Sequence, residues 1–314
     1  MTTHIFGMAL THEGIFSNNR GENEGNTNTL QKVIRNGDLF STVSAEAIRY
    51  ALRDGWQQSG ENLNRRTRDH RAVEYTDREF NAEEWPNRLD DDVLGFMHAS
   101  NNTVSRRAPL EVTRAISITP WTGETIHNFA AAGSNPAVKA SDPIPYSVEV
   151  HHTRYQFGFA LTPDSLGRES NDAASTHNDD EKIRRIEATL NGIASLRRVG
   201  GAHARYFADY SPEILILRVT TDPAPRMLYC FEQHEGSGDI SIYALESKLG
   251  RDINPEELII GTAIDISGLG NLEKDNDGQI TGEGSWKGAI LTEGVKDAVK
   301  MCVERLKGNT QQSV

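Results

Sequence analysis

Apolar and polar positions change their spacing along the chain, and each spacing predicts one kind of element. Residues 4–10 (HIFGMAL) are an apolar run rich in strand-forming residues, which predicts a β-strand. Residues 11–29 are polar and rich in glycine and asparagine, which predicts a loop. Further on, Ser44 is a good helix N-cap, and Gly55 predicts the end of that helix. Four apolar residues lie between them at helical spacing: Ala47, Ile48, Ala51 and Leu52.

Two longer strands are predicted in the middle of the chain. Residues 105–119 and 146–161 alternate apolar and polar positions, as strands with one buried face do. Tyr155, Phe157 and Phe159 share one face of the second strand. Aromatic residues in this arrangement stack RNA bases in RNA-recognition motifs, but the basic-glycine signature of those motifs is missing here. We therefore expect a buried aromatic face covered by helices.

Two amphipathic helices and two irregular intervals complete the pattern. Residues 179–198 and 293–307 carry apolar stripes at helical spacing, which predicts helices. Residues 57–104 are polar and charged, with too little apolar content for a core of their own, so we interpret them as an insertion. Residues 119–145 are rich in glycine, alanine, serine, asparagine and proline and lie between two strands. This interval predicts a protruding hairpin.

The resulting order is strand, helix, strand, strand, helix, strand, which predicts an α+β fold. It is the β-α-β-β-α-β order of a ferredoxin-like or RNA-recognition-type palm. We expect this palm to carry a finger-like insertion and a protruding thumb hairpin. The expected boundaries are 1–56, 105–118 and 146–234 for the palm, 57–104 for the fingers, 119–145 for the thumb, and 235–314 for C-terminal strands and a closing helix that belong to the palm.

Composition is that of a soluble globular protein, because 37% of the 314 residues are hydrophobic and 25% are charged. The first residues lack a basic segment followed by an apolar run, and no stretch approaches about 20 apolar residues. We therefore expect neither a signal peptide nor a membrane helix. The two cysteines, Cys230 and Cys302, lack metal-ligand spacing, which suggests a reducing cytoplasm and no zinc site. No motif indicates a cofactor.

The net charge of −12 argues against a nucleic-acid-binding protein with a uniformly basic surface. A local basic groove remains open, because six arginines fall within one segment: Arg49, Arg53, Arg65, Arg66, Arg68 and Arg71. Arg49 and Arg53 lie on one face of the predicted helix, with Cβ atoms about 6 Å apart, close to the spacing of successive phosphates. They could form a phosphate clamp, with Ser44 at the positive end of the helix. The alternative is two solvated surface arginines.

Other basic residues lie near predicted loops and strand ends. Arg20 is in the polar stretch 11–29, whose backbone N–H groups could cradle phosphate, although an ordinary loop is equally consistent with this composition. Arg106 and Arg107 stand at the beginning of a strand, where such a pair can grip backbone phosphates.

A glycine pair follows the second predicted helix, in the stretch LRRVGGAHAR at 196–205. Gly200 and Gly201 permit positive φ and a close backbone approach. Basic residues flank the pair, which suggests a loop that grasps a nucleic acid strand: Arg197, Arg198, His203 and Arg205. A glycine helix end followed by a tight turn is the alternative, but it leaves the arginines unexplained. A general-base role for His203 has no serine, cysteine or paired carboxylate to support it.

Two acidic stretches could suggest metal sites. Asp90, Asp91 and Asp92 are consecutive, but three aspartates at a helix start more often serve capping and solvation. Residues 273–284 match a calcium loop except at the last position, where Gly284 replaces the required glutamate. We expect a charged turn there, and no metal.

Three stretches resemble one protein family. They are VSAEAIRYALR at 43–53, LDDDVLGFM followed by SRRAPLEVTRAISI within 89–118, and LRRVGGAHARYFADYSPE at 196–213. They resemble the Cas-seven backbone subunits of type I CRISPR interference complexes, and among these the DevR-type autoregulator branch, with an I-B-like system the nearest type. The resemblance covers most of residues 4–235, whereas the C-terminal third matches little that is specific.

The resemblance implies a RAMP-type palm and a non-catalytic subunit that polymerises along a CRISPR RNA within a Cascade complex. Such a subunit grips the RNA backbone and presents the guide for pairing with target DNA, in antiviral defence or in transposition. The implied partners are the RNA, the paired DNA strand, further copies of the chain and other Cascade subunits, with no membrane. The candidate RNA-binding residues are Arg20, Ser44, Arg49, Arg53, Arg106, Arg107, Arg197, Arg198, His203 and Arg205.

Three other functions stay open. A type III-like backbone subunit would cut target RNA with a loop acid, and Glu22, Glu24 and Asp38 are the acids of the matching loop. A transcriptional autoregulator is a second possibility, although no helix-turn-helix is visible and the chain is acidic. A metabolic enzyme with a small-molecule pocket has no motif to support it.

Overall fold

Strand β1 (His4–Thr11) lies at the centre of the molecule in the computed structural model, paired with β16 (Tyr155–Leu161) on one side and β17 (Pro212–Thr220) on the other. All but the first residue of β1 are buried, as its apolar sequence requires. The structure describes residues 2–68, 72–99, 103–130, 144–169, 174–201, 203–234 and 238–311, and within these ranges it leaves out several side chains, among them those of 19–22, 203 and 204.

A nine-stranded sheet grows from these three strands, and its neighbours pair antiparallel except for β20 and β21. Strand β11 (Leu110–Val112) pairs with β16 beside the main path. The order is β21 (Ile290–Thr292), β20 (Leu258–Thr262), β17, β1, β16, β12 (Ala115–Ser117), β6 (Asp38–Val43) and β5 (Lys32–Arg35). The chain therefore has a mixed α/β fold in which segments from both ends of the sequence share one sheet.

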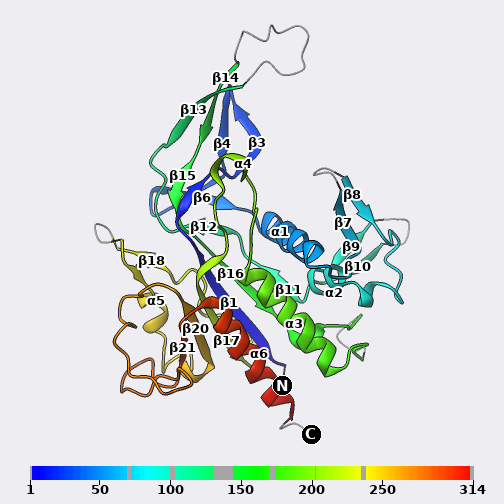
Figure 1. Ribbon diagram of the computed structural model, residues 1–314, viewed down its shortest axis with the longest axis vertical. Helices are drawn as coiled ribbons and strands as arrows, with labels where there is room; N and C mark the ends of the chain where they lie inside the picture. Colours follow the sequence, from blue (N-terminus) through cyan, green and yellow to red (C-terminus); the bar gives the residue numbers. More distant parts are fainter. Residues whose placement is uncertain are drawn as a thin grey trace.

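Three helices cover one face of this sheet, and Figure 1 shows them side by side. They are α1 (Ala45–Gln58), α3 (Asp179–Ala194) and α6 (Val295–Gln311). The helix of residues 44–55 is confirmed, with the Ser44 hydroxyl as its N-cap, although it continues past Gly55 to Gln58. The aromatic face of β16 is buried beneath these helices, which confirms that Tyr155 and Phe157 are core residues.

The other face of the sheet is covered by the C-terminal third of the chain. Residues between Met227 and Leu291 form a second core against β1, β17 and β20. Short elements make up this cover: β18 (Glu232–Gln233), β19 (Ile240–Ser241), α5 (Tyr243–Glu246) and η3 (Pro255–Glu257). The rest of that third enters the sheet as β20 and β21 or packs on α3 as α6.

The interval 57–104 contains more regular structure than its polar sequence predicts, and in Figure 1 it lies beside α1. Phe80, Trp85 and Phe96 form a small apolar cluster of their own there. Its elements are β7 (Arg65–Arg68), β8 (Ala72–Tyr75), η1 (Trp85–Asn87), α2 (Leu89–Leu94), β9 (Phe96–His98) and β10 (Val104–Arg106). We call residues 57–106 the insertion.

A second sheet protrudes at one end of the molecule (Figure 1). Its order is β13 (Thr125–Ala130), β14 (Ile144–Glu149), β4 (Thr27–Leu30) and β3 (Asn19–Glu24). The prediction of a loop over 11–29 is wrong, because β3 and β4 form a hairpin and β4 pairs with β14. Strand β2 (Gly14–Phe16) likewise pairs with β15 (His151–Thr153). Strands β2 and β4 therefore pair with segments more than 100 residues away in the chain.

Two short elements and the exact bounds of two helices complete the description. The helix predicted for 179–198 ends four residues early, at Ala194, and the one predicted for 293–307 spans Val295–Gln311. A 3-10 turn η2 (Pro163–Ser165) follows β16, and a one-turn helix α4 (His203–Tyr206) precedes β17. Of the helices that the structure describes, none is both long and apolar enough to cross a membrane.

Candidate nucleic-acid interface

The glycine pair after α3 forms a tight loop, which we define as residues 196–201 and call the glycine loop. Gly200 and Gly201 have φ values of 58° and 77°. A Cβ atom at Gly201 would lie 2.3 Å from the backbone oxygen of Ser17, so only glycine fits there. The loop is therefore pressed by its backbone against the chain between β2 and β3.

The glycine loop also meets the beginning of α1. A Cβ atom at Gly200 would lie 3.7 Å from Oδ1 of Asn18 and 4.0 Å from a methyl group of Val43, the residue before the N-cap of α1. Asn18 is buried, and its Oδ1 accepts a hydrogen bond from the Tyr210 hydroxyl at 2.5 Å. Its amide nitrogen is buried without a hydrogen-bond partner among the described residues.

Three of the predicted RNA-binding arginines reach solvent around this loop. Arg197 and Arg198 are exposed within it, and Arg205 is exposed on α4. The guanidinium carbon of Arg205 lies 5.2 Å from the ring centroid of Tyr146 on β14, so this arginine extends the basic surface toward the protruding sheet. We call Arg197, Arg198 and Arg205 the basic trio. The side chains of Arg20 and His203 lie outside the described residues, although their backbones belong to β3 and α4.

The structure does not favour the predicted phosphate clamp on α1, because both arginines are half-buried and bond to other parts of the protein. The Arg49 guanidinium donates to the backbone oxygens of Leu94 and Leu110. Nε of Arg53 donates to Asp90 at 3.2 Å. Burial lowers the pKa of both arginines, which nevertheless stay charged. Ser44 is buried and its hydroxyl is used within its own helix, so it is a cap and not an exposed phosphate ligand.

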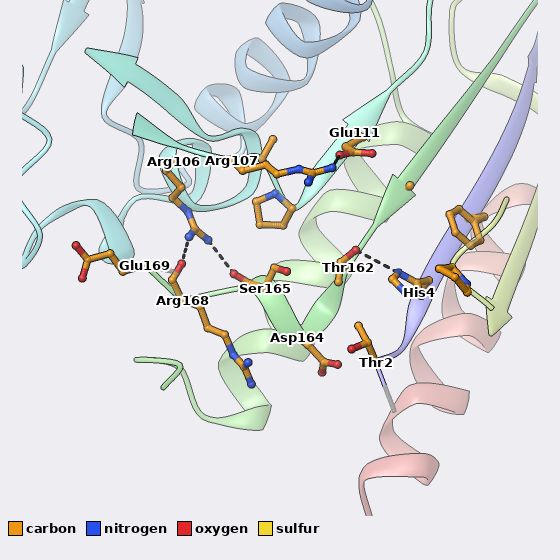
Figure 2. Close-up of a pocket in the computed structure, with 15 residues that line it drawn as sticks. Thr2, His4, Arg106, Arg107, Glu111, Thr162, Asp164, Ser165, Arg168 and Glu169 are labelled. Carbon is orange, nitrogen blue, oxygen red and sulfur yellow. Dashed lines mark hydrogen bonds and ion pairs between the residues drawn. The ribbon is translucent and has the colours of Figure 1, made fainter. Parts of the chain in front are cut away.

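Arg106 and Arg107 lie at the opposite end of the sheet from the glycine loop. Strand β11 pairs with the part of β16 that faces the N-terminal half of β1. Strand β17, which follows the glycine loop and α4, begins opposite Thr11 at the C-terminal end of β1. The prediction of a surface role for Arg106 is wrong, since only 9% of it is exposed and it donates to the backbone oxygens of Ser165 and Arg168 (Figure 2). The side chain of Arg107 is 89% exposed, and it forms an ion pair with Glu111 at 2.6 Å. It lines a pocket near the beginning of β1, together with His4 and Thr162 (Figure 2).

The consecutive aspartates of α2 are buried, so the prediction of a solvated helix cap is wrong for them. Asp90 accepts hydrogen bonds from the backbones of Asn64 and Arg65 as well as from Arg53. Asp92 accepts from Arg106, Arg185, His177 and the backbone of Gly167. Burial by itself raises the pKa of Asp92. These hydrogen bonds and charges outweigh burial, so the pKa of Asp92 lies below its usual value. Asp90 and Asp92 thus tie the insertion to α1 and α3 of the core, whereas Asp91 accepts hydrogen bonds from Asn64 and Arg65 within the insertion. No group of three potential metal ligands occurs in the described ranges.

Asp91 should make the stability of the protein depend on pH. Burial, and then the charge of Asp90, raise its pKa from 3.8 to about 7. Between these values the folded state binds more protons than the unfolded state, so this group's contribution to stability falls as pH rises. We expect Asp91→Asn to gain stability relative to wild type between about pH 4.5 and about pH 8, as measured by urea unfolding. A stability difference between Asp91→Asn and wild type that stays constant over this pH range would contradict this expectation.

One functional candidate was missed by sequence analysis. Phe207 directly follows α4, and 90% of its surface is exposed. Its φ is 44°, in the left-handed region that residues other than glycine rarely adopt. In the structure, exposed and half-buried or buried positions alternate from Arg205 to Tyr210. That alternation was hidden because both Tyr206 and Phe207 are aromatic.

Comparisons with known proteins agree on one family. A family model described as "CRISPR-associated negative auto-regulator DevR/Csa2" matches residues 15–234. A curated relative from Myxococcus xanthus (strain DK1622), "CRISPR-associated protein Cas7/Cst2/DevR", is 37% identical over 325 aligned positions, which cover 98% of this chain and 99% of the relative.

Solved structures show a similar fold at lower sequence identity. A chain of a "CRISPR RNA-guided surveillance complex, pre-nicking" has a TM-score of 0.61 and 12% identity, with 96% of this chain and 100% of that chain covered. A chain of a "CRISPR RNA-guided surveillance complex" has a TM-score of 0.59 and 12% identity, with 96% and 99% covered.

Proposed function

The chain belongs to the DevR/Csa2 family of CRISPR-associated proteins, as its three sequence stretches suggested, and on that premise we propose that it is an RNA-binding backbone subunit of a CRISPR surveillance complex. The structures of similar fold are chains of complexes named as CRISPR RNA-guided, which supports a guide RNA as the ligand. We propose that several copies bind along one guide and grip its backbone, and that base pairing of the guide reads the target DNA.

The observation that carries this proposal is the basic trio on the glycine loop and α4. The chain as a whole has a net charge of −12, so a polyanion would be repelled by most of its surface. The trio nevertheless presents three exposed guanidinium groups where the core sheet, α1 and the protruding sheet meet. Arginine is suited to phosphate because its planar fork donates two parallel hydrogen bonds.

We interpret the central part of the sheet as a ferredoxin-like palm of the RAMP type. Its support is the strand order β17-β1-β16-β12, antiparallel throughout, with α1 and α3 on one face. In this interpretation the insertion forms the fingers, and the protruding sheet contains the thumb. The thumb then includes β3 and β4 from the N-terminal region as well as residues 119–145.

Purification after co-expression with a CRISPR array and the other subunits of the system tests this proposal. We expect the protein to elute as a multimer containing RNA of uniform length with a repeat-derived end. The reason is that copies joined head to tail would align their basic trios along one strand. Mass photometry and sequencing of the extracted RNA provide the measurement. Monomers free of RNA would refute the proposal.

We propose that the subunit has no nuclease activity of its own, because Glu24 and Asp38 lie on different strands, β3 and β6. Incubating the purified complex with magnesium and RNA complementary to its guide separates the alternatives. Regular cuts that disappear in Glu22→Ala, Glu24→Ala or Asp38→Ala would favour the ribonuclease. Specific binding of RNA-free protein to promoter DNA upstream of its own gene would favour the autoregulator.

A further inference from the structure

Phe207 is held outward by the segment that carries it. Arg205 and Tyr206 end α4, and residues 207–210 have no regular secondary structure. From 205 to 210, exposed positions alternate with half-buried or buried ones. Tyr206, Ala208 and Tyr210 line a small cavity beside the glycine loop, together with Asn18. Tyr210 anchors this side through its hydrogen bond to Asn18. Because the neighbours on both sides face inward, the ring of Phe207 is fixed toward solvent.

Exposure of this ring is unusual for the protein. Phe207 is the most exposed large apolar residue in the part of the chain that the structure describes. It also has a left-handed backbone conformation, which is costly for a bulky side chain and often marks a functional site. The other strongly exposed apolar side chains lie on other elements: Ile34 on β5, Met97 on β9, Phe129 on β13 and Tyr243 on α5. A lone ring does not provide the contiguous apolar patch that a protein partner buries.

The charges near Phe207 favour an anionic ligand. Arg205 precedes it by two residues, and the glycine loop with Arg197 and Arg198 packs against the cavity that Tyr206 lines. Asp209 is the acidic residue on the same outward side, and it accepts a hydrogen bond from the backbone of Ser211. An exposed aromatic face between cationic groups is the arrangement with which proteins hold single-stranded nucleic acid.

We propose that Phe207 is a stacking platform for one nucleobase of the bound RNA, while the basic trio holds the neighbouring phosphates. The inference rests on the proposed function, because it needs RNA at the glycine loop. Stacking uses the π-face that every base has, so the contact tolerates any base in a variable guide. Phe207 would thus fix the position of one nucleotide per subunit without reading its identity.

Binding of a short single-stranded RNA to purified protein tests the inference. We expect Phe207→Ala to weaken binding by about 5- to 150-fold, the effect of losing one stacked base. The salt slope should not change, because no charge is removed. Phe207→Tyr keeps a ring and should bind within about threefold of wild type. Tyr243→Ala, an exposed aromatic on α5, is the matched control and should bind normally.

A direct signal comes from Phe207→Trp, whose indole fluorescence a stacked base should quench on RNA addition. If wild type binds RNA and Phe207→Ala binds it with the same affinity, the inference is overturned and the proposed function is left intact. Wild type that binds no RNA would overturn both. Normal RNA affinity of Phe207→Ala combined with a smaller assembly would make the ring a contact between protein subunits, and that result too would overturn the inference. Thermal melting of each variant shows that the fold is retained.

Discussion

Asp92→Ala is expected to lower the free energy of unfolding by about 3–5 kcal/mol, the cost of breaking a buried ion pair. The Asp92 side chain is fully buried, and it accepts hydrogen bonds from Arg185 at 2.8 Å and from the Gly167 backbone at 2.8 Å. Arg106 donates to it as well and stacks 4.2 Å over the ring of Trp85. The substitution would leave two buried guanidinium groups without their shared carboxylate. Typical domains are stable by only about 5–15 kcal/mol, so this loss is severe.

Urea unfolding followed by circular dichroism measures the effect. Asp92→Asn keeps one acceptor oxygen and should lose less stability, so it provides data if the alanine variant does not fold. The matched control is Glu111→Ala, which removes an exposed ion pair with Arg107 and should cost about 0–1 kcal/mol. Equal losses for Asp92→Ala and Glu111→Ala would show that the buried cluster does not hold the insertion in place.

Replacing the basic trio by alanine is expected to weaken RNA binding strongly and to reduce its dependence on salt. Each arginine that neutralises a phosphate contributes about 0.7 to the salt slope on single strands, so the triple variant should lose about 2. If both proteins bind equally at about 1 M salt, affinity at about 0.15 M salt falls about 50-fold. The loss should be similar for different RNA sequences, because phosphate contacts position a strand without reading it.

A salt titration of short-RNA binding provides the measurement. The control variant removes three exposed cations of the C-terminal region, Arg251, Lys296 and Lys300, and so changes the net charge equally. It should change the slope by much less, because those side chains lie away from the glycine loop. Equal slopes for the two triple variants would mean that the RNA responds only to total charge, and that the basic trio is not its binding site.

Local patterns predicted the central elements well, and the reason is visible in particular residues. Ser44 caps α1 through the backbone of Ala47, three residues away, so this contact lies within the window that a helical pattern covers. The buried aromatic positions of β16 follow from alternation within seven residues. In contrast, β3 and β4 have no apolar alternation; β4 is a strand because the distant β14 provides a partner, and β3 pairs in turn with β4.

By itself the sequence determined the order of the main strands and helices, the family, and the glycine loop with its arginines, because all of these depend on residues close together in the chain. Only the tertiary structure decided which arginines are available to a ligand. Arg53 meets Asp90 across 37 positions, and Arg185 meets Asp92 across 93. The sequence shows the same charged residue in every case. Whether it faces solvent depends on which distant carboxylate the fold brings to it, since a buried charge must be paired.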